Sequence, residues 1–302
     1  MSDVQTVQGL VQTKGKLQGG VASSTMLQPK WKWNPNGHGY SIDVETPDLT
    51  NAISAIRELC LLRAGGDSSW QDFDVREARD SLKQRVSKKV RVLEIGCGDS
   101  HGLARAFVND AAAVEITFVD PGSDFDAFPQ STSYRFVQGV FPQALLPTSD
   151  SPDRWGVHDE DCYDVVYSAR CLHCNTPSGM VDALRLIRAV LNPTHGRFIV
   201  ATTGLKSGFY QQKEALVAYF LARRHESFPG HITAEEFQKH WPKWSVGDVT
   251  LLAGLCELRQ ILRESGVGAV VHEQTYCMRN QDGNVDEMLV AVAARSEQVS
   301  RT

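Results

Sequence analysis

The chain has 302 residues, 42% of them hydrophobic, which suits a globular protein with one large domain or two small ones. Its net charge of -5 offers no basic surface to DNA or RNA, and the lack of any apolar run of about 18 residues predicts no membrane span. The first residues lack the pattern of a signal peptide and the seven cysteines are irregularly spaced, so we expect a cytoplasmic protein without disulfides.

The first 45 residues show no clear hydrophobic period, and residues 1–28 are rich in Gln, Ser, Thr, Val and Gly, which predicts a flexible arm. Trp31, Trp33 and Tyr40 follow among turn residues. Tryptophan side chains are costly to leave in water, so we expect them to pack on something. Two interpretations stay open: an active-site lid that contacts the substrate, or a strap on the outside of the core.

Residues 46–302 are predicted to form one α/β domain that begins with two helices. Thr46-Pro47-Asp48 starts the first helix, because proline suits a first turn, and its apolar stripe ends before two glycines. A highly charged stretch over residues 72–86 predicts the second helix.

A short apolar strand over residues 90–95 ends in a loop with Gly96 and Gly98, and a helix is expected over residues 100–109. Glycine lets the backbone turn sharply and lets a ligand approach closely. A second apolar strand, residues 116–119, ends in Asp120. An acid at that position can accept hydrogen bonds from both hydroxyls of a ribose, which predicts a nucleoside-cofactor site.

The dinucleotide-binding fingerprint requires a third glycine where this chain has a histidine, and an acid, Glu94, instead precedes the loop. Glu94, Gly96, Cys97 and Gly98 resemble the first motif of the class I S-adenosylmethionine-dependent methyltransferases of small-molecule type, with Ser100 at the motif's third glycine. The resemblance implies S-adenosyl-L-methionine as cofactor, with the two glycines beneath its methionine part and the acid of the second strand on its ribose. It also implies an α/β fold: a seven-stranded, mostly parallel sheet with helices on both faces and a C-terminal antiparallel hairpin.

A third strand over residues 134–138 precedes Val140 and Phe141, against one of which the adenine would rest. The family often has an acid at this strand's end that bonds the adenine amino group, and Gln138 is the nearest polar residue here. The residues expected around the cofactor are Glu94, Gly96, Cys97, Gly98, Asp120, Pro121, Val140, Phe141 and Ser168.

The fourth strand, residues 163–168, is followed by a turn that resembles the family's fourth motif, which faces the transferable methyl group. His173 in this turn is either a structural residue near the cofactor or the general base that removes a proton from the acceptor. Cys171 and Cys174 lack the two further ligands of a zinc site and the context of a redox pair, so no metal is predicted.

A helix over residues 180–191 and a fifth strand over residues 196–202 continue the alternation that gives a parallel sheet with its ligand at the carboxyl edge. Two further strands, residues 269–278 and 286–293, are joined by an Asp-Gly turn, which is a hairpin signal. This hairpin is a feature of the class I methyltransferase fold that a plain dinucleotide-binding fold lacks.

Residues 205–266 are predicted to be a helical cap insertion without strands, with helices over residues 208–225 and 249–265. A short helix is expected between these two helices. Thr233 at its start and Glu236 three residues later have the pattern of a capping box. We expect these helices to cover the pocket. The residues expected to contact the substrate are Trp31, Trp33, Tyr40, Thr203 and Tyr210.

The predicted activity is transfer of a methyl group to an oxygen or nitrogen of a small metabolite, with no nucleic-acid or membrane partner. The order of the segments also has a faint likeness in layout to the histamine N-methyltransferase group, which hints at an amine. Two alternatives stay open: an enzyme of this fold that uses the sulfonium in a rearrangement, and a non-catalytic partner subunit, which the intact glycine loop disfavours. The oligomeric state is open too, with a homodimer as one option.

Overall fold

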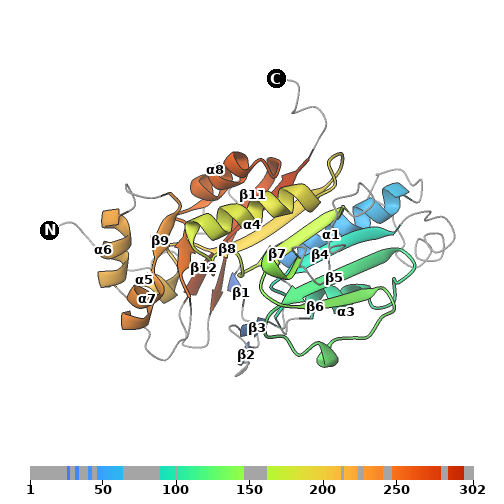
Figure 1. Cartoon of the computed structure of the whole chain (residues 1–302), viewed down its shortest axis with the longest axis horizontal. Coiled ribbons are helices and arrows are strands. Elements are labelled where there is room, and N and C mark those ends of the chain that lie inside the picture. Colours follow the sequence, from blue (N-terminus) through green and yellow to red (C-terminus); the bar gives the residue numbers. More distant parts are fainter. Residues whose placement is uncertain are drawn as a thin grey trace, which may run out of the picture.

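The computed structural model of the chain is built on one central sheet (Figure 1). Within the described ranges, none of the helices combines the length and the apolar character that a membrane crossing requires. The structure describes residues 26–27, 31–33, 40–42, 46–63, 89–98, 101–145, 162–211, 214–223, 228–240, 247–279 and 285–295.

The strands of this sheet follow the order β6-β5-β4-β7-β8-β12-β11-β1. β12 lies antiparallel between β8 and β11, and the two-residue strand β1 extends the sheet beside β11. The predicted fold class, a mostly parallel seven-stranded sheet with a C-terminal antiparallel hairpin, is therefore confirmed, with β1 as an eighth strand. The bounds are β4 Val90–Ile95, β5 Val114–Asp120, β6 Tyr134–Gln138, β7 Val165–Ala169, β8 Arg197–Thr203, β11 Ala269–Arg279, β12 Val285–Ala294 and β1 Met26–Leu27.

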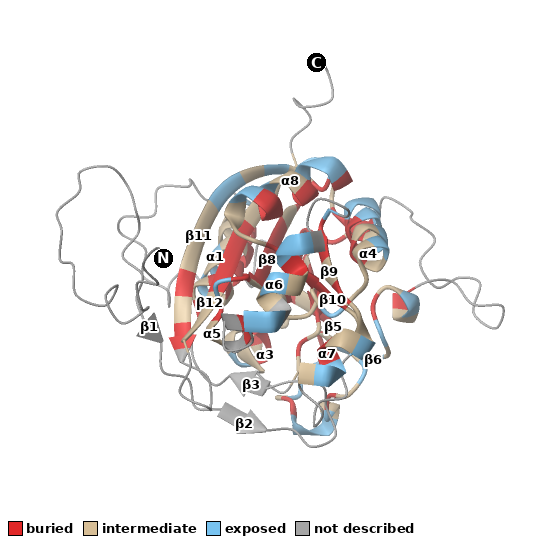
Figure 2. Cartoon of the chain, turned by 90° about the vertical axis from the view of Figure 1, so that its left-hand side faces the viewer, coloured by how far each residue is buried: buried red, intermediate tan, exposed pale blue. Residues whose placement is uncertain are grey.

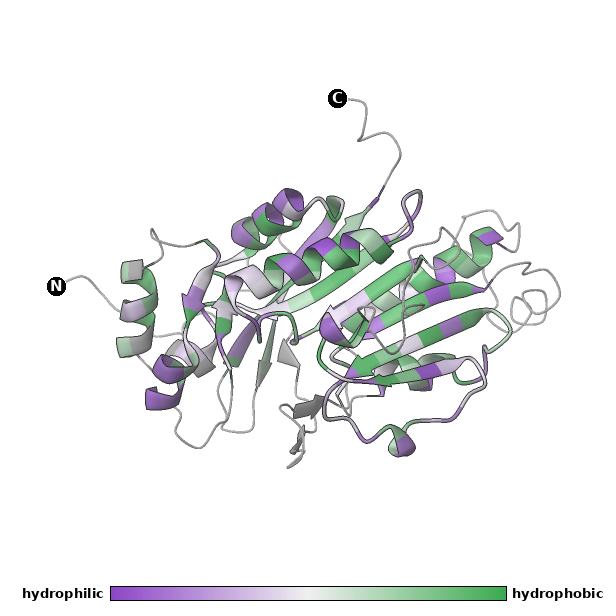
Figure 3. Ribbon diagram, in the orientation of Figure 1, coloured by the Kyte–Doolittle hydropathy of each residue, from purple (hydrophilic) through white to green (hydrophobic). Residues whose placement is uncertain are grey.

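Helices cover both faces of the sheet (Figure 1). On one face, α4 (Pro177–Val190) and α8 (Leu255–Ser265) bury their apolar stripes in one core cluster. On the other face, α1 (Pro47–Arg63) and α3 (Gly102–Phe107) pack in a second cluster. Figure 3 shows strands that are mainly hydrophobic between helices of mixed character, and Figure 2 shows the buried residues of the sheet inside the exposed outer sides of the helices. This arrangement is what a parallel sheet with two apolar faces requires.

Several helix ends follow from local chemistry. α1 starts at Pro47, as predicted. One half of the predicted capping box is present at α7 (Ala234–His240), where the Glu236 N–H donates to Thr233 Oγ1 at 3.2 Å, while the Glu236 side chain contacts Lys239 and His240. α3 is shorter than predicted, because His101 adopts a left-handed conformation with φ of 53° and the helix begins only after it.

The prediction that residues 205–266 contain no strand is wrong. β9 (Gly230–Ile232) and β10 (Val249–Leu251) form a two-stranded antiparallel sheet. The helix predicted over residues 249–265 therefore begins later, as α8. The described parts of the one predicted from Gly208 are the helices α5 (Gly208–Gln211) and α6 (Glu214–Arg223). Strands of three residues are too short to show the alternation by which strands are recognised.

The segment before α1 contains described backbone as well. β2 (Trp31–Trp33) pairs antiparallel with β3 (Tyr40–Ile42). β1 departs from the expected flexible arm, because its backbone pairs with β11 at Cys277 and Met278. The side chains of Trp31, Trp33 and Tyr40, on which the choice between lid and strap depends, lie outside the described part of the chain, as does the helix predicted over residues 72–86.

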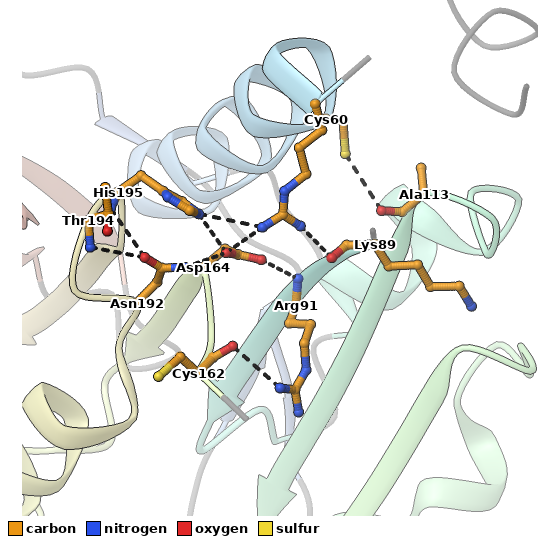
Figure 4. A network of polar contacts seen from close by, with 10 residues as sticks. Cys60, Lys89, Arg91, Ala113, Cys162, Asp164, Asn192, Thr194 and His195 are labelled. Atoms are coloured by element: carbon orange, nitrogen blue, oxygen red, sulfur yellow. Dashed lines mark hydrogen bonds and ion pairs between the residues drawn. The ribbon is translucent and has the colours of Figure 1, made fainter. Parts of the chain in front are cut away.

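A buried network ties the amino ends of the strands together (Figure 4). Asp164 is 2% exposed and its Oδ1 accepts hydrogen bonds from Arg63 Nη2 at 2.7 Å and Asn192 Nδ2 at 3.2 Å. His195 Nε2 lies 2.8 Å from the same oxygen, and the Arg91 N–H donates to Oδ2 at 2.8 Å. His195, which the sequence suggests to be simply a turn residue, thus helps to join α1, β4 and the turn before β8.

Replacing His195 with alanine should lower the free energy of unfolding by about 1–2 kcal/mol, because it removes a hydrogen bond to a buried carboxylate. Urea unfolding measures this change. Arg185→Ala is the control, since its ion pair with Asp182 is exposed and should contribute less than about 0.5 kcal/mol. Equal effects of the two substitutions would contradict a structural role for His195.

Candidate functional site

The glycine loop after β4 adopts the backbone that its sequence requires. Gly96 and Gly98 have φ of 68° and 53°, a left-handed conformation that glycine adopts without strain. The Gly96 N–H donates to the carbonyl of Val119 at 2.8 Å, and the Gly98 N–H donates to Asp120 Oδ2 at 3.1 Å. The loop therefore folds over the carboxyl end of β5, where the predicted ribose site lies.

Asp120 is held by backbone N–H groups of two loops. Its Oδ2 accepts from Gly98 and its Oδ1 from the N–H of Gly122 at 2.8 Å. The Ser123 hydroxyl donates to the carbonyl of Gly98 at 2.8 Å and lies 3.8 Å from Cys97 Sγ. A carboxylate offers about four acceptor positions, so Asp120 keeps capacity for further donors. Ser123 belongs to no motif and could not be recognised from the sequence.

The two loop glycines differ in what surrounds them. A Cβ built on Gly96 would lie 2.3 Å from the Cβ of Cys171, whereas one built on Gly98 would meet nothing within 4 Å. Cys171, from the turn after β7, thus packs directly beneath the loop. No described atom lies within 4 Å of that position beside Gly98.

Gly96→Ala should therefore destabilise the protein by about 2–4 kcal/mol, because it adds a steric clash to the strain of a left-handed alanine. Gly98→Ala should cost only the strain, about 1 kcal/mol. Thermal and urea unfolding of the two variants measure the difference. A loss for Gly98→Ala as large as that for Gly96→Ala would show that the packing against Cys171 is not as described.

At the adenine end, Val140 and Phe141 take different roles. Val140 is 56% exposed, whereas Phe141 is 5% exposed and belongs to the main core cluster. Val140 is therefore the residue of the two that can accept a flat apolar ring. Pro121 is exposed, and its carbonyl accepts a hydrogen bond from Gln138 Nε2 at 3.3 Å.

Glu94 is 4% exposed at the end of β4. Burial raises the pKa of its carboxyl to about 8, with Arg170 opposing the rise and Asp120 and Asp48 adding to it. At neutral pH the side chain is therefore largely protonated. A cation bound beside it would favour the ionised form, because an opposite charge lowers the pKa of a carboxyl group.

The turn after β7 is positioned by the insertion. The Thr250 N–H of β10 donates to the carbonyl of His173 at 2.8 Å, and the Thr250 hydroxyl donates to the carbonyl of Asn175 at 2.6 Å. Burial, together with the charge of Arg170, lowers the pKa of His173 to about 4. The imidazole is therefore neutral across the physiological range. This differs from the near-neutral pKa of an ordinary imidazole, and the sequence cannot show the burial that causes it.

Four buried polar atoms of this region lack a hydrogen-bond partner among the described residues: Ser168 Oγ, Arg170 Nη1, His173 Nδ1 and Thr202 Oγ1. Ser168 and Thr202 lie near the ends of β7 and β8. Arg170 and His173 lie in the turn between β7 and α4. Buried polar atoms in native proteins are nearly always bonded, so such a group indicates a place for a ligand's polar atoms. Of these residues, Arg170 and Thr202 were not named as site residues from the sequence, although Arg170 lies in the turn expected to face the methyl group.

Two of the predicted substrate residues, Thr203 and Tyr210, lie in different surroundings in the structure. Thr203 ends β8, partly buried, opposite Met288 of β12. Tyr210 is 3% exposed in the core cluster of the insertion, and burial raises the pKa of its hydroxyl, with Cys174 and Asp286 adding to the rise. Tyr210 therefore lies near the turn after β7, although its ring is used for packing.

Among the described residues, no group of three or more His, Cys, Asp and Glu side chains is arranged to hold a metal ion. Cys171 packs against the glycine loop and Cys174 is exposed. The pair therefore separates into a packing residue and a surface residue.

No family model matches the chain, and no curated protein matches it. Solved structures with a similar arrangement include an S-adenosylmethionine-dependent methyltransferase from Methanosarcina mazei, 13% identical, covering 75% of this chain and 99% of that one with a TM-score of 0.45. A putative O-methyltransferase from Nostoc punctiforme is 16% identical, covering 83% and 69% with a TM-score of 0.39. The N-methyltransferase NodS from Bradyrhizobium japonicum is 14% identical, covering 74% and 96% with a TM-score of 0.39.

Proposed function

We propose that the chain binds S-adenosyl-L-methionine at the carboxyl edge of its sheet and transfers the methyl group to an oxygen or nitrogen of a small metabolite. This proposal rests on the arrangement of four residues: Glu94, Gly96, Gly98 and Asp120. It joins an acid before a left-handed glycine loop to a second acid that is fixed by the N–H of that loop. The match of these four residues to the first motif and ribose acid of the class I methyltransferases supports this cofactor.

The residues present fit such a cofactor in shape and in charge. The space beside Gly98 admits a ligand close to the backbone, and Asp120 keeps acceptor positions for two ribose hydroxyls. Glu94, largely protonated in the free protein, can ionise beside a cationic group. Val140 provides an exposed apolar surface for the adenine ring.

The chain itself would align the acceptor with the methyl group, exclude water from the site and accept the proton that the acceptor loses. When bound, S-adenosyl-L-methionine supplies an electrophilic methyl on a sulfonium, and the acceptor atom must approach in line with the breaking bond. The insertion seats β10 on the turn after β7, which helps to exclude water. His173 Nδ1 can accept the proton that an acceptor O–H or N–H loses, and the hydroxyls of Ser168 and Thr202 can orient the acceptor.

A small acceptor is favoured by the negative net charge and by the insertion that covers the turn. The layout likeness to the histamine N-methyltransferase group favours an amine. Because the proposed acceptor atom is an oxygen or a nitrogen, the test includes both phenols and amines.

The test begins with native mass spectrometry of the purified protein for retained cofactor, followed by calorimetry with S-adenosylhomocysteine. A screen of amine and phenol metabolites then measures release of S-adenosylhomocysteine from S-adenosyl-L-methionine. Binding with release in the presence of one acceptor class supports the proposal. Binding without release from any acceptor would favour a rearrangement or a partner subunit, and absence of binding would refute the cofactor itself.

A further inference from the structure

Arg170 is a positively charged residue that forms no ion pair with a described carboxylate. It is the first residue after β7, and its Nη1 is buried without a hydrogen-bond partner among the described residues. None of the described carboxylates lies within ion-pair distance of its guanidinium. The guanidinium has a side-chain hydrogen bond with Tyr276, but no carboxylate balances its charge. A buried charge without a counter-charge is costly, so a site of this kind is suited to receive one from a ligand.

The two nearby acids are not available to it. Asp48, at the start of α1 and fully buried, accepts the hydroxyl of Tyr167 at 2.7 Å on Oδ2 and that of Tyr276 at 2.6 Å on Oδ1. Asp48 is thus bonded to two tyrosine hydroxyls, and it does not lie within ion-pair distance of Arg170. Glu94, the second acid, largely keeps its proton at neutral pH because burial raises its pKa.

The guanidinium nevertheless stays charged. Burial lowers the pKa of Arg170, but Tyr276, Asp48 and Tyr167 together raise it by more, so the net shift is upward. Within the described residues, Arg170 is also the only cation that affects the pKa of Glu94 or of His173. The region therefore holds one charged guanidinium that forms no ion pair with a described carboxylate, which suits the carboxylate of a ligand.

The backbone at Arg170 adds an independent observation. Its φ is 56°, a left-handed conformation that is strained for any residue but glycine, and its N–H donates to the carbonyl of Ala201 at 2.8 Å. Strained residues of this kind cluster at ligand sites, where the surrounding structure holds them in place. Arg170 follows β7 at the carboxyl edge of the sheet, where the proposed cofactor binds.

We propose that Arg170 is the receptor for the carboxylate of a bound ligand. A planar guanidinium matches a carboxylate with two parallel N–H donors, and the unpartnered Nη1 supplies one of them. The inference rests on the proposed function, under which a carboxylate can come from two sources: the amino-acid end of the cofactor, or the acceptor substrate.

Calorimetry with two ligands distinguishes these sources. S-adenosylhomocysteine carries the amino-acid carboxylate, whereas 5′-methylthioadenosine has the same nucleoside and thioether without it. If the cofactor is the source, Arg170→Met should weaken S-adenosylhomocysteine by about 10- to 100-fold and leave 5′-methylthioadenosine unchanged. Arg170→Lys should recover part of the loss, because it keeps the charge without the fork. Arg259→Met, which removes an exposed arginine paired with Glu273, should change neither affinity.

If the substrate is the source, Arg170→Met should leave the affinities for S-adenosylhomocysteine and 5′-methylthioadenosine unchanged. The substitution should instead change turnover. Hydroxybenzoates and aminobenzoates, compared with their methyl esters, are the probes. The parent should favour the free acids by about 10-fold or more, and Arg170→Met should remove this preference.

The inference is overturned if Arg170→Met weakens both nucleosides equally, which would show a structural role. It is also overturned if the substitution changes neither nucleoside affinity nor the preference between acids and esters. Failure of the parent protein to bind either nucleoside would instead refute the proposed function together with the inference that rests on it.

Discussion

Asp120→Ala should weaken the binding of S-adenosylhomocysteine more than any other single substitution in the cofactor site. Each ribose hydroxyl that bonds an ionised carboxylate contributes about 1.5–3 kcal/mol, so the loss of two such bonds lowers affinity by at least about a hundredfold. Isothermal calorimetry measures this directly. The expectation follows from an acid at the end of β5 whose position is fixed by two backbone N–H groups.

The loop bonds of Asp120 require a control, because alanine removes them as well. Asp120→Asn keeps one carbonyl oxygen for the N–H of Gly98 or Gly122 and should still lose most of the affinity. Asp124→Ala removes an exposed acid of the same loop, whose side chain caps a single turn, and should change affinity little. An Asp120→Ala protein that folds and binds with unchanged affinity would refute the ribose assignment.

His173→Gln should lower turnover by about a hundredfold, with cofactor affinity nearly unchanged. General bases contribute about a hundred- to ten-thousandfold, and the low pKa of His173 places it toward the lower limit, because a weaker base accepts a proton less readily. His272→Gln, which replaces an exposed histidine on β11, is the matched control and should leave turnover unchanged.

The pH dependence is the sharper part of this prediction. Because the pKa of His173 is lowered to about 4, the basic form is fully present above about pH 5 and is lost only as the pH falls through about 4. The difference in rate between parent and His173→Gln should therefore stay constant from about pH 6 to 9. A step in that difference near pH 6.5 would contradict the lowered pKa. Rates within a few-fold of each other at every pH would exclude His173 as a base.

The strands and the glycine loop were predictable because their causes are local. Apolar runs of five to seven residues, an acid and two glycines determine how β4 ends, and Asp120 follows from the length of the next strand. The hairpin of β11 and β12 likewise follows from its turn chemistry. These features depend on neighbours in sequence, which the sequence displays.

The polar surroundings of Arg170 depend on distant neighbours. Asp48 lies 119 residues from Tyr167 and 228 from Tyr276, and no period or motif links them. In sequence, Asp48 is simply a favourable acid in the first turn of a helix. The burial that lowers the pKa of His173 and raises that of Glu94 is equally a property of the assembled layers, which is why the catalytic side of the site was less predictable than the cofactor loop.

The place of β12 in the sheet has a consequence for how the chain is made. β12 follows both of its neighbours along the chain, and it nevertheless occupies an interior position between β8 and β11. Until β12 is in place, β8 has an open edge of unpaired N–H and C=O groups, and β11 with Tyr276 is not joined to the rest of the sheet. A chain in which β12 has not yet been added can pair wrongly with another strand, so an intermediate that lacks the ten residues of β12 is prone to aggregate.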